Sequence, residues 1–199
     1  MAASPSHLVF PYPHGLLRFV LRAPLLFYRL GLGDLLNAAH ILVLTTQGRR
    51  SGQPRHTPVE YRRHGRKISL VSAWGARTNW CQNLVGNADV TLQLGQRILG
   101  AQAQIVTDPA EALRAIHLFR RTAPGRYDTV LSYVIEETVN ARTLPNLSGQ
   151  FTIVRLDLTP EVPLPGLPVN LAWVWPLSLL VGVAAVGLFT FARLRKTQD

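Results

Sequence analysis

The middle of the chain contains short apolar segments in which β-branched and alternating residues dominate, and this pattern predicts β-strands. The predicted strands are residues 41–46, 57–62, 67–73, 89–94, 96–107 and 151–158. Gly65-Arg66 and Gly95-Gln96 lie between predicted strands and are typical of tight hairpin turns. Strands of this number and length in about 120 residues favour a small closed or split barrel.

Helical patterns interrupt the strands and make the predicted fold class α+β. A short helix is predicted over residues 79–86. A second helix begins after Asp108, because Asp is a preferred N-cap residue and Pro109 and Glu111 suit the first turn. A further helix is predicted over residues 127–141.

The N-terminal stretch LLRFVLRAPLLFYRLGLGDLL, residues 16–36, places Arg18, Arg22 and Arg29 among apolar residues at near-helical spacing. This spacing predicts one or two amphipathic helices within an N-terminal segment of residues 1–37. Such helices suit the headgroup region of a membrane, and they equally suit packing across the domain's own barrel. The two interpretations are compatible, because a helix pair has room for a protein side and a lipid side.

The C-terminal part of the chain carries no charged residue from Leu171 to Ala192. About 20 apolar residues are enough to span the hydrocarbon core, so we predict a transmembrane helix over 171–192 rather than a buried core helix. Trp173 and Trp175 stand at one end, and a basic tail of residues 193–199 stands at the other. A proline-rich linker, residues 160–170, then separates this anchor from the barrel domain, residues 38–159.

Membrane orientation is indicated by two opposing signals. The basic residues after the span favour a cytoplasmic C-terminus, which would export the domain. However, prolines and arginines interrupt the apolar residues before Pro24, so no signal peptide is evident. Cys81 is the only cysteine, which excludes a disulfide framework within the chain. We therefore expect a catalytic domain on the cytoplasmic side of the membrane.

Basic residues outnumber acidic ones by 21 to 11, and all but Lys67 and Lys196 are arginines. Arginine favours planar, bidentate recognition of phosphate or carboxylate. A basic face beside anionic lipid is an alternative interpretation of part of this charge. A nucleic-acid partner is not expected, because the arginines lack interleaved aromatic residues on which bases stack.

The densest group of candidate functional residues is TTQGRRSGQPRHTP, residues 45–58. This segment follows a predicted strand and presents Arg49, Arg50 and Arg55 around two glycines. Glycine allows a sharp turn and a close approach of the backbone to a ligand, and guanidinium groups bind anionic oxygens. Composition alone is compatible both with an anion-binding loop and with an exposed basic hairpin.

No metal site is predicted, because the histidines show no paired spacing of the H-x-x-x-H kind. They are His7, His14, His40, His56, His64 and His117.

The segments ILVLTTQGRRSGQPRHTPVEY and ISLVSAWGARTNWCQNLVGNADVTLQLG resemble the deazaflavin-dependent nitroreductase family. Its members are also described as quinone reductases that use reduced coenzyme F-420. The resemblance extends from Arg22 to Leu158 and rests on the order of several motifs. It implies a split β-barrel related to flavin-nucleotide-binding barrels, with the deazaflavin ring in a groove and the acidic coenzyme tail on the basic loop.

Matching motif to motif, the resemblance implies a set of cofactor-binding residues in four short segments. The tail-binding loop holds Arg49, Arg50, Ser51, Gly52 and Arg55; Thr57 and Pro58 lie beside the ring; Ser72, Ala73, Trp74 and Gly75 line the ring and substrate pocket; and Asn79, Trp80 and Asn83 belong to the short helix that contacts the coenzyme. FMN is the less favoured cofactor.

The resemblance also implies a reaction that requires no acid–base pair. A reduced deazaflavin donates hydride from its own ring, so the protein has to hold donor and acceptor close together. Ser72 and Trp74 are the candidate catalytic residues, with Ser72 positioned to bind an acceptor oxygen as negative charge develops. One departure is Cys81, where the family usually has an aromatic residue. We expect Cys81 to be a small buried hydrophobe rather than a nucleophile.

The expected function is therefore hydride transfer from reduced coenzyme F-420 to an apolar acceptor at the membrane, such as a quinone or a nitro compound. The alternative is a membrane-anchored module that binds a deazaflavin or flavin without turnover. The natural acceptor and the oligomeric state do not follow from the sequence.

Overall fold

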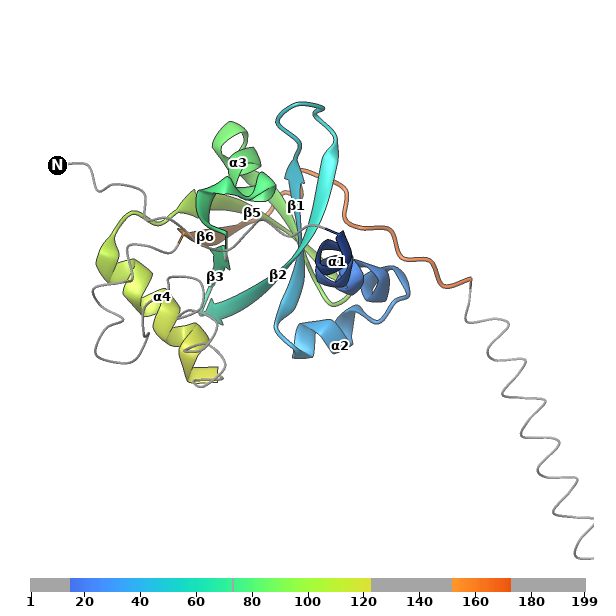
Figure 1. Ribbon diagram of the computed structural model, residues 1–199, viewed down its shortest axis with the longest axis horizontal. Coiled ribbons are helices and arrows are strands. Elements are labelled where there is room, and N and C mark those ends of the chain that lie inside the picture. The colour runs from blue at the N-terminus through green and yellow to red at the C-terminus, as the bar shows by residue number, and fades with distance from the viewer. Residues whose placement is uncertain (1–14, 73, 123–151, 173–199) are drawn as a thin grey trace, which may run out of the picture.

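The computed structural model describes residues 15–72, 74–122 and 152–172. In this part of the chain, antiparallel strands form a closed barrel in the order β1-β2-β3-β6-β5-β4 (Figure 1). The strands are β1 (Ile41–Gln47), β2 (Pro54–His64), β3 (Lys67–Ser72), β4 (Asp89–Leu94), β5 (Arg97–Ile105) and β6 (Thr152–Thr159). Pairing of Val43 with Gln93 and of Thr45 with Thr91 closes the barrel between β1 and β4. The predicted barrel is therefore confirmed.

All six predicted strands are present, with shifts at their ends. The largest shift is in β2, which begins at Pro54 rather than at residue 57. The N–H of Gly48 donates to the Gln53 carbonyl oxygen at 2.9 Å, which continues the hairpin pairing up to the loop. At the predicted turns, Gly65 and Gly95 adopt φ values of 60° and 61°, in the left-handed region that favours glycine.

The helices in the described residues are α1 (Gly15–Arg29), α2 (Gly33–Ala38), α3 (Asn79–Gly86) and α4 (Pro109–Thr122), with a 3-10 turn η1 (Gly75–Arg77). The predicted N-cap is confirmed, because the Asp108 carboxylate accepts hydrogen bonds from the N–H groups of Ala110 and Glu111 at 3.1 and 3.2 Å. The predicted helix over residues 127–141 lies outside the described residues.

The barrel interior is filled by leucine, isoleucine and valine side chains, and α3 covers one end of it. Leu42, Leu44 and Leu156 are fully buried there. From α3, Trp80 and Cys81 pack into the same cluster. Cys81 is 1% exposed, which confirms the expectation of a small buried side chain, and its burial raises the pKa of the thiol.

Outside the barrel, α1 packs on β1 and β2 through Tyr28, which lies against Val43. The Tyr28 hydroxyl donates to the Ile41 carbonyl oxygen at 2.8 Å and accepts from the Gly95 N–H at 3.2 Å. Burial raises the pKa of Tyr28 to about 12. The predicted packing of the N-terminal helices across the barrel is thus confirmed.

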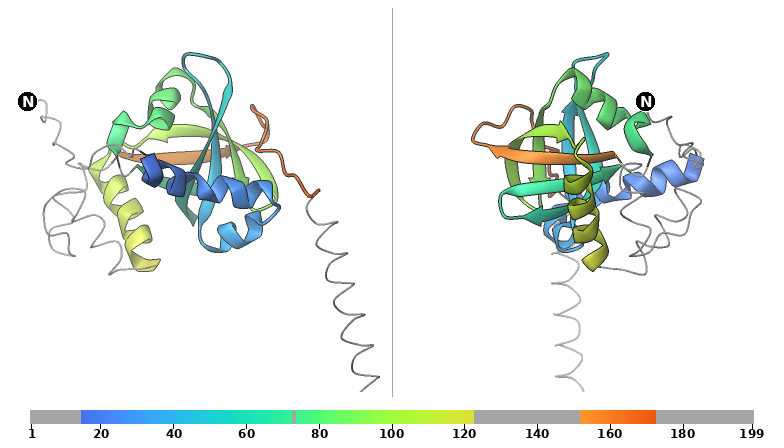
Figure 2. Two further views of the ribbon diagram at one scale, coloured as in Figure 1. Left: turned by 45° about the vertical axis from the view of Figure 1, so that its right-hand side comes forward. Right: turned by 90° about the vertical axis from the view of Figure 1, so that its left-hand side faces the viewer.

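The predicted proline-rich linker between the barrel and the anchor, residues 160–170, makes hydrogen bonds with the outside of the barrel. Thr91 exchanges hydrogen bonds with Leu164 at 2.7 and 3.0 Å, and the Leu167 N–H donates to the Gln93 side-chain oxygen at 3.1 Å. The segment therefore runs along the outside of the barrel, where Figure 2 shows it in orange. We refer to residues 160–172 as the strap.

Among the described residues, no helix is long and apolar enough to cross a membrane. Of the predicted span over 171–192, only residues 171 and 172 belong to the described part of the chain.

Candidate functional site

The loop between β1 and β2 is a tight turn that projects from one end of the barrel (Figure 1). The N–H groups of Ser51 and Gly52 both donate to the Gly48 carbonyl oxygen, at 3.1 and 2.7 Å. Gly52 adopts a φ of 66°, which a residue with a side chain rarely adopts. The turn leaves Arg49 and Arg50 exposed at its tip. We call residues 48–55 the arginine loop.

Arg49 fixes the arginine loop to α3. Its backbone N–H donates to Asn83 Oδ1 at 3.2 Å, and its Nη1 donates to Asn79 Oδ1 and Asn83 Oδ1, both at 3.4 Å. Asn83 is 4% exposed, and its Nδ2 donates to Thr46 Oγ1 at 3.0 Å. The structure therefore brings together the predicted loop and helix residues. Asn83 of α3 is hydrogen-bonded both to β1 and to the arginine loop, so it connects the three segments.

The other two arginines of the loop are available for a ligand. The Arg50 side chain makes no hydrogen bond or ion pair with any residue in the described part of the chain, and Arg55 Nη2 donates only to Ser51 Oγ, at 3.2 Å. Residues 45–58 contain no Asp or Glu. Guanidinium groups without a carboxylate partner bind phosphate or carboxylate oxygens well, so the loop suits an acidic coenzyme tail.

The predicted ring-binding positions in β2 lie beside the loop. Thr57 pairs with Leu44 and Pro58 with Val43, and both are half-buried. Next to them, His56 Nδ1 and Thr45 Oγ1 lie 2.9 Å apart and share a hydrogen bond. Burial lowers the pKa of His56, and the positive charge of Arg29 lowers it further.

Ser72 is turned toward the protein interior, where it is 3% exposed. Its Oγ donates to the Gly75 carbonyl oxygen at 2.8 Å and lies 3.2 Å from Thr78 Oγ1. These contacts hold the turn between β3 and α3, so they give Ser72 a positioning role and provide no support for a direct contact with an acceptor. Trp74 is half-buried, and Ala73 lies outside the described residues.

Trp80, for which the resemblance implies a contact with the coenzyme, lies mostly in the core. Its side chain is 8% exposed and belongs to the core cluster, with Cys81 and Leu84 of the same helix. The helix α3 lies across one end of the barrel and turns one side toward its interior. The core side chains on that side, including Trp80, close this end. The described contacts therefore support a packing role for Trp80.

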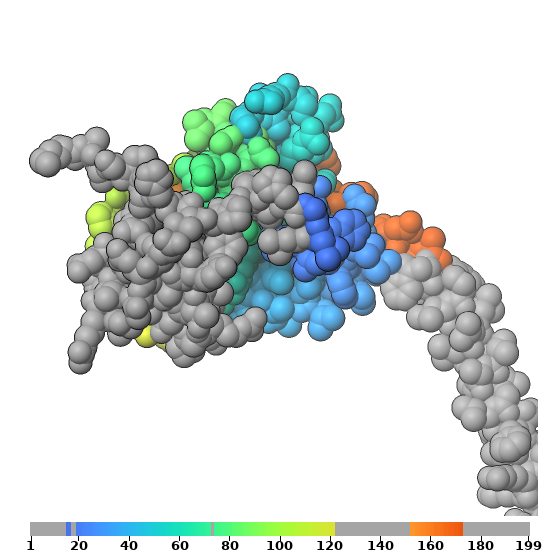
Figure 3. Space-filling view, in the orientation of Figure 1, coloured from blue at the N-terminus to red at the C-terminus, as the bar shows by residue number. Residues whose placement is uncertain are grey.

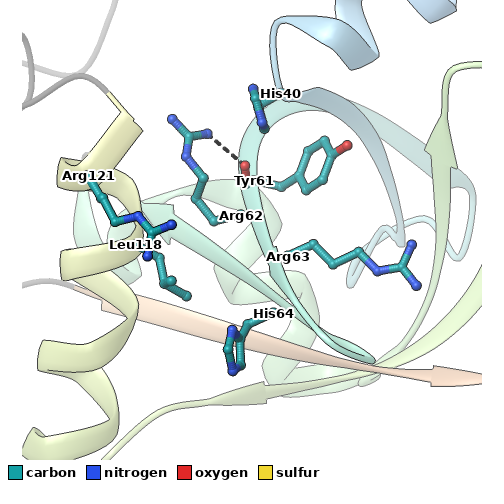
Figure 4. Close-up of a pocket in the computed structure, with 7 residues that line it drawn as sticks. All are labelled: His40, Tyr61, Arg62, Arg63, His64, Leu118 and Arg121. Carbon is teal, nitrogen blue, oxygen red and sulfur yellow. Dashed lines mark hydrogen bonds between the residues drawn. The ribbon is translucent and has the colours of Figure 1, made fainter.

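A separate groove, with a volume of about 500 Å³, lies at the other end of β2. Its lining residues are His40, Tyr61, Arg62, Arg63, His64, Leu118 and Arg121. Figure 4 shows that the Arg63 side chain extends away from Arg62 and Arg121, so the three guanidinium groups do not converge. Arg62 is already neutralised by Glu60 at 2.8 Å. The groove therefore lacks the converging guanidinium groups without a carboxylate partner that would suit an anion.

Sequence reasoning did not single out the groove or the bond from Asn87 Nδ2 to Gln47 Oε1, which is 2.6 Å long and joins the end of α3 to the end of β1. The basic run from Arg62 to His64 is a sequence signal for the groove. No sequence pattern indicates that Leu118 and Arg121 of α4 line its other side. In the described part of the chain, no group of His, Cys, Asp and Glu residues is suited to a metal ion.

A family model described as F420H2-dependent quinone reductase matches residues 27–137. Similar solved structures include an F420H2-dependent reductase, with 21% identity over 60% of this chain and 94% of that one and a TM-score of 0.42. Another is a protein of Listeria innocua described as a pyridoxamine 5′-phosphate oxidase, with 14% identity, coverage of 64% and 93%, and a TM-score of 0.42. A heme storage protein from Vibrio cholerae has 17% identity, coverage of 61% and 83%, and a TM-score of 0.44.

Proposed function

The chain belongs to the family of F420H2-dependent quinone reductases, and on this premise we propose that it transfers hydride from reduced coenzyme F-420 to a quinone, a nitro compound or another apolar acceptor. Family membership makes the chain an oxidoreductase and implies the coenzyme. The choice of acceptor and the site of the reaction are the parts that we propose.

The observation that supports this proposal most directly is the arginine loop. Arg50 and Arg55 are exposed on a loop without acidic residues, and Arg49 fixes that loop to α3 through amide oxygens. A fixed loop loses little conformational freedom when it binds an anion, so more of the interaction energy is available for affinity. The donor set fits the acidic tail of the coenzyme.

When bound, the coenzyme supplies a hydride, and a quinone that accepts it takes up one proton to become the quinol. The protein contributes by holding the two ring systems near contact, which is worth several kcal/mol in an oriented pair. In this chain, Asn83 holds β1 and the arginine loop to α3, and Ser72 holds the turn that precedes α3. Both residues therefore serve the reaction as positioning residues in our proposal.

We further propose that residues 171–192 anchor the barrel to a membrane, with the barrel on the cytoplasmic side and lipid as a partner. The support is the uncharged composition of this stretch. An anchored barrel would meet quinones where these apolar molecules dissolve. A second candidate function is a module that binds a deazaflavin or flavin without turnover, because the same loop would hold the same acidic tail.

The test uses the full chain purified in detergent. Fluorescence titrations with F-420, FMN and FAD are expected to show the tightest binding for F-420. Addition of a soluble quinone to the protein with reduced F-420 is then expected to regenerate the absorbance of the oxidised coenzyme. Binding of F-420 without quinone-dependent reoxidation would favour the non-catalytic module, and a preference for FMN would contradict the proposed cofactor.

A further inference from the structure

The large exposed hydrophobic side chains gather on one part of the molecule. Eight of the fourteen described side chains of this kind belong to α1, α2 and the turn between them. They are Leu16, Phe19, Val20, Leu21, Leu26, Phe27, Leu32 and Leu35. A soluble monomer rarely exposes so many apolar side chains in one region, and such regions mark interaction surfaces.

Helical spacing turns the α1 residues of this group into a surface. Leu16, Val20 and Phe27, and likewise Phe19 and Leu26, recur at intervals of four or seven positions, which place side chains on one side of a helix. Tyr28 occupies the opposite side and is 1% exposed against the barrel. The exposed Arg22 and Arg29 flank the apolar residues. Residues 15–33 contain no acidic residue.

The strap reaches the same region from the other end of the sequence. The Asn170 N–H donates to the Arg29 carbonyl oxygen at 2.7 Å. A Cβ added at Gly31 would lie 2.6 Å from Leu171 Cδ2 and 3.6 Å from Val169 Cγ1, so the strap crosses the chain just after α1. Val169 and Leu171 are themselves 47% and 56% exposed. Figure 3 shows the blue surface of α1 and α2 beside the orange end of the strap.

These helices are held firmly to the barrel. Tyr28 bonds to β1 and to the β4–β5 turn, and the Gln96 N–H of that turn donates to Asp34 Oδ1 of α2 at 3.3 Å. A Cβ added at Gly33 would meet the Gly95 carbonyl oxygen at 2.8 Å, which shows how closely α2 approaches the turn. A surface bound to the exposed side of α1 would therefore fix the orientation of the whole barrel.

From this geometry we propose that the exposed apolar side of α1, flanked by Arg22 and Arg29, lies in the headgroup region of an anionic membrane. The occupant is a bilayer because the strap ends beside the C-terminal end of α1, at the point in the sequence where the uncharged stretch 171–192 begins. The apolar side chains would enter the acyl boundary and the arginines would meet lipid phosphates. This inference rests on the membrane anchor proposed above and not on the proposed hydride transfer.

The consequence is a second contact with the membrane that sets how the barrel lies. A single anchoring helix leaves a domain free to rotate above the surface, whereas a helix in the interface adds a second attachment. The barrel would then present a constant side to the acceptors dissolved in the bilayer.

The test measures depth with nitroxide spin labels on the full chain in vesicles that contain an anionic phospholipid. Single cysteines replace Phe19 and Leu26 on the apolar side of α1, and Val85→Cys on α3 is the matched control. Phe19 and Val85 are both 78% exposed, so labelling should be equally easy. Cys81 is buried, and the unsubstituted chain is expected to take up no label.

We expect labels at positions 19 and 26 to collide several-fold more often with oxygen, relative to a water-soluble nickel complex, than the label at position 85. Vesicles of a neutral phospholipid should reduce this difference.

Equal collision ratios at all three positions, in a chain that sediments with vesicles, would overturn the inference. Labels at 19 and 26 shielded from both reagents in a dimer would overturn it in favour of a second copy. A chain that does not sediment with vesicles would refute the anchor as well, and quinone-dependent coenzyme oxidation reports separately on the reaction.

Discussion

Arginines occur in two contrasting environments in this barrel. In the arginine loop, Arg49 contacts only amide oxygens and Arg50 has no ionic partner among the described residues. Away from the loop, Arg62 lies 2.8 Å from Glu60, and Arg155 lies 2.9 Å from both Glu111 and Asp157. The same type of side chain therefore stands without a carboxylate partner among the described residues in one place and is paired with carboxylates in the other.

The difference shows that net charge alone does not locate an anion site. A guanidinium paired with a carboxylate has already lost much of its attraction for a ligand. Hydrogen bonds to Glu111 and then to Asp157 raise the pKa of Arg155, which is the signature of a satisfied ion pair. In the arginine loop, no carboxylate of the described residues pairs with a guanidinium group.

The largest effect is expected from Arg50→Ala. Loss of one hydrogen-bonded contact with a charged group costs about 1.5 to 3 kcal/mol, so the Kd for F-420 should rise roughly tenfold to a hundredfold. The melting temperature should stay unchanged, because the Arg50 side chain bonds to no other described residue. Fluorescence titration and thermal unfolding measure the two quantities.

Arg66→Ala is the matched control for this change, since Arg66 is also an exposed arginine in a hairpin turn. It should leave both the Kd and the melting temperature unaltered. If Arg66→Ala weakened F-420 binding as much as Arg50→Ala, the effect would reflect overall charge, and the distinction between the two environments would fail.

Arg62→Ala should lower the stability of the fold and leave F-420 binding unchanged, which is the reverse of the result expected for Arg50→Ala. Arg62 is 7% exposed, donates to the Tyr61 carbonyl oxygen at 2.7 Å and stacks 4.9 Å from the centre of the Phe119 ring. Its removal leaves Glu60 without a partner, although Glu60 is partly solvated, so we expect a loss of about 1 to 3 kcal/mol in the free energy of unfolding. Urea unfolding tests this value, and the Kd for F-420 should not change.

Part of this contrast could have been inferred from the sequence. Glu60 and Arg62 are two positions apart in a predicted strand and therefore share one face, which makes their pairing foreseeable. The ring of Phe119 comes from α4, and neither propensity nor spacing places that helix over β2. For the arginine loop, the resemblance named the residues and the sequence shows no Asp or Glu within 45–58, whereas only the fold shows that no carboxylate of the other described residues pairs with them.

Asn83→Ala should change both the Kd for F-420 and the free energy of unfolding, each by less than the substitutions above. It removes the connection between Thr46 and Arg49 and leaves their polar groups partly unsatisfied, at a cost of about 1 to 2 kcal/mol in unfolding free energy. The arginine loop should then bind F-420 a few-fold more weakly, because part of the affinity is spent on ordering it. Asn79→Ala, at an exposed position with a longer contact, should change both values less.

Other features of the fold lay beyond sequence reasoning because they depend on contacts between distant segments. Prolines at residues 160–168 predict a linker between the barrel and the anchor, but they give no sign that Thr91 and Gln93 of β4 hold this segment against the barrel. Trp80 matched a coenzyme-binding motif, whereas the closure of the barrel end required a large apolar side chain there. Local patterns gave the strands and the Asp108 cap, where the determinants lie within a few residues.

The smallest effect is expected from His56, which borders the arginine loop without carrying its charge. Burial and Arg29 lower its pKa in the folded state, so the neutral form is favoured there. The unfolded chain then binds more protons than the folded chain below the ordinary pKa of about 6.5. Stability contributed by this group is therefore complete above that pH and declines as the pH falls through 6.5 toward the lower pKa of the folded state.

Melting temperatures between pH 5 and 8 should show this decline. His56→Gln should flatten it, while Arg50→Ala should leave it in place. A slope unchanged in His56→Gln would mean that another group titrates, and His56 would then add nothing to the balance of charge beside the loop.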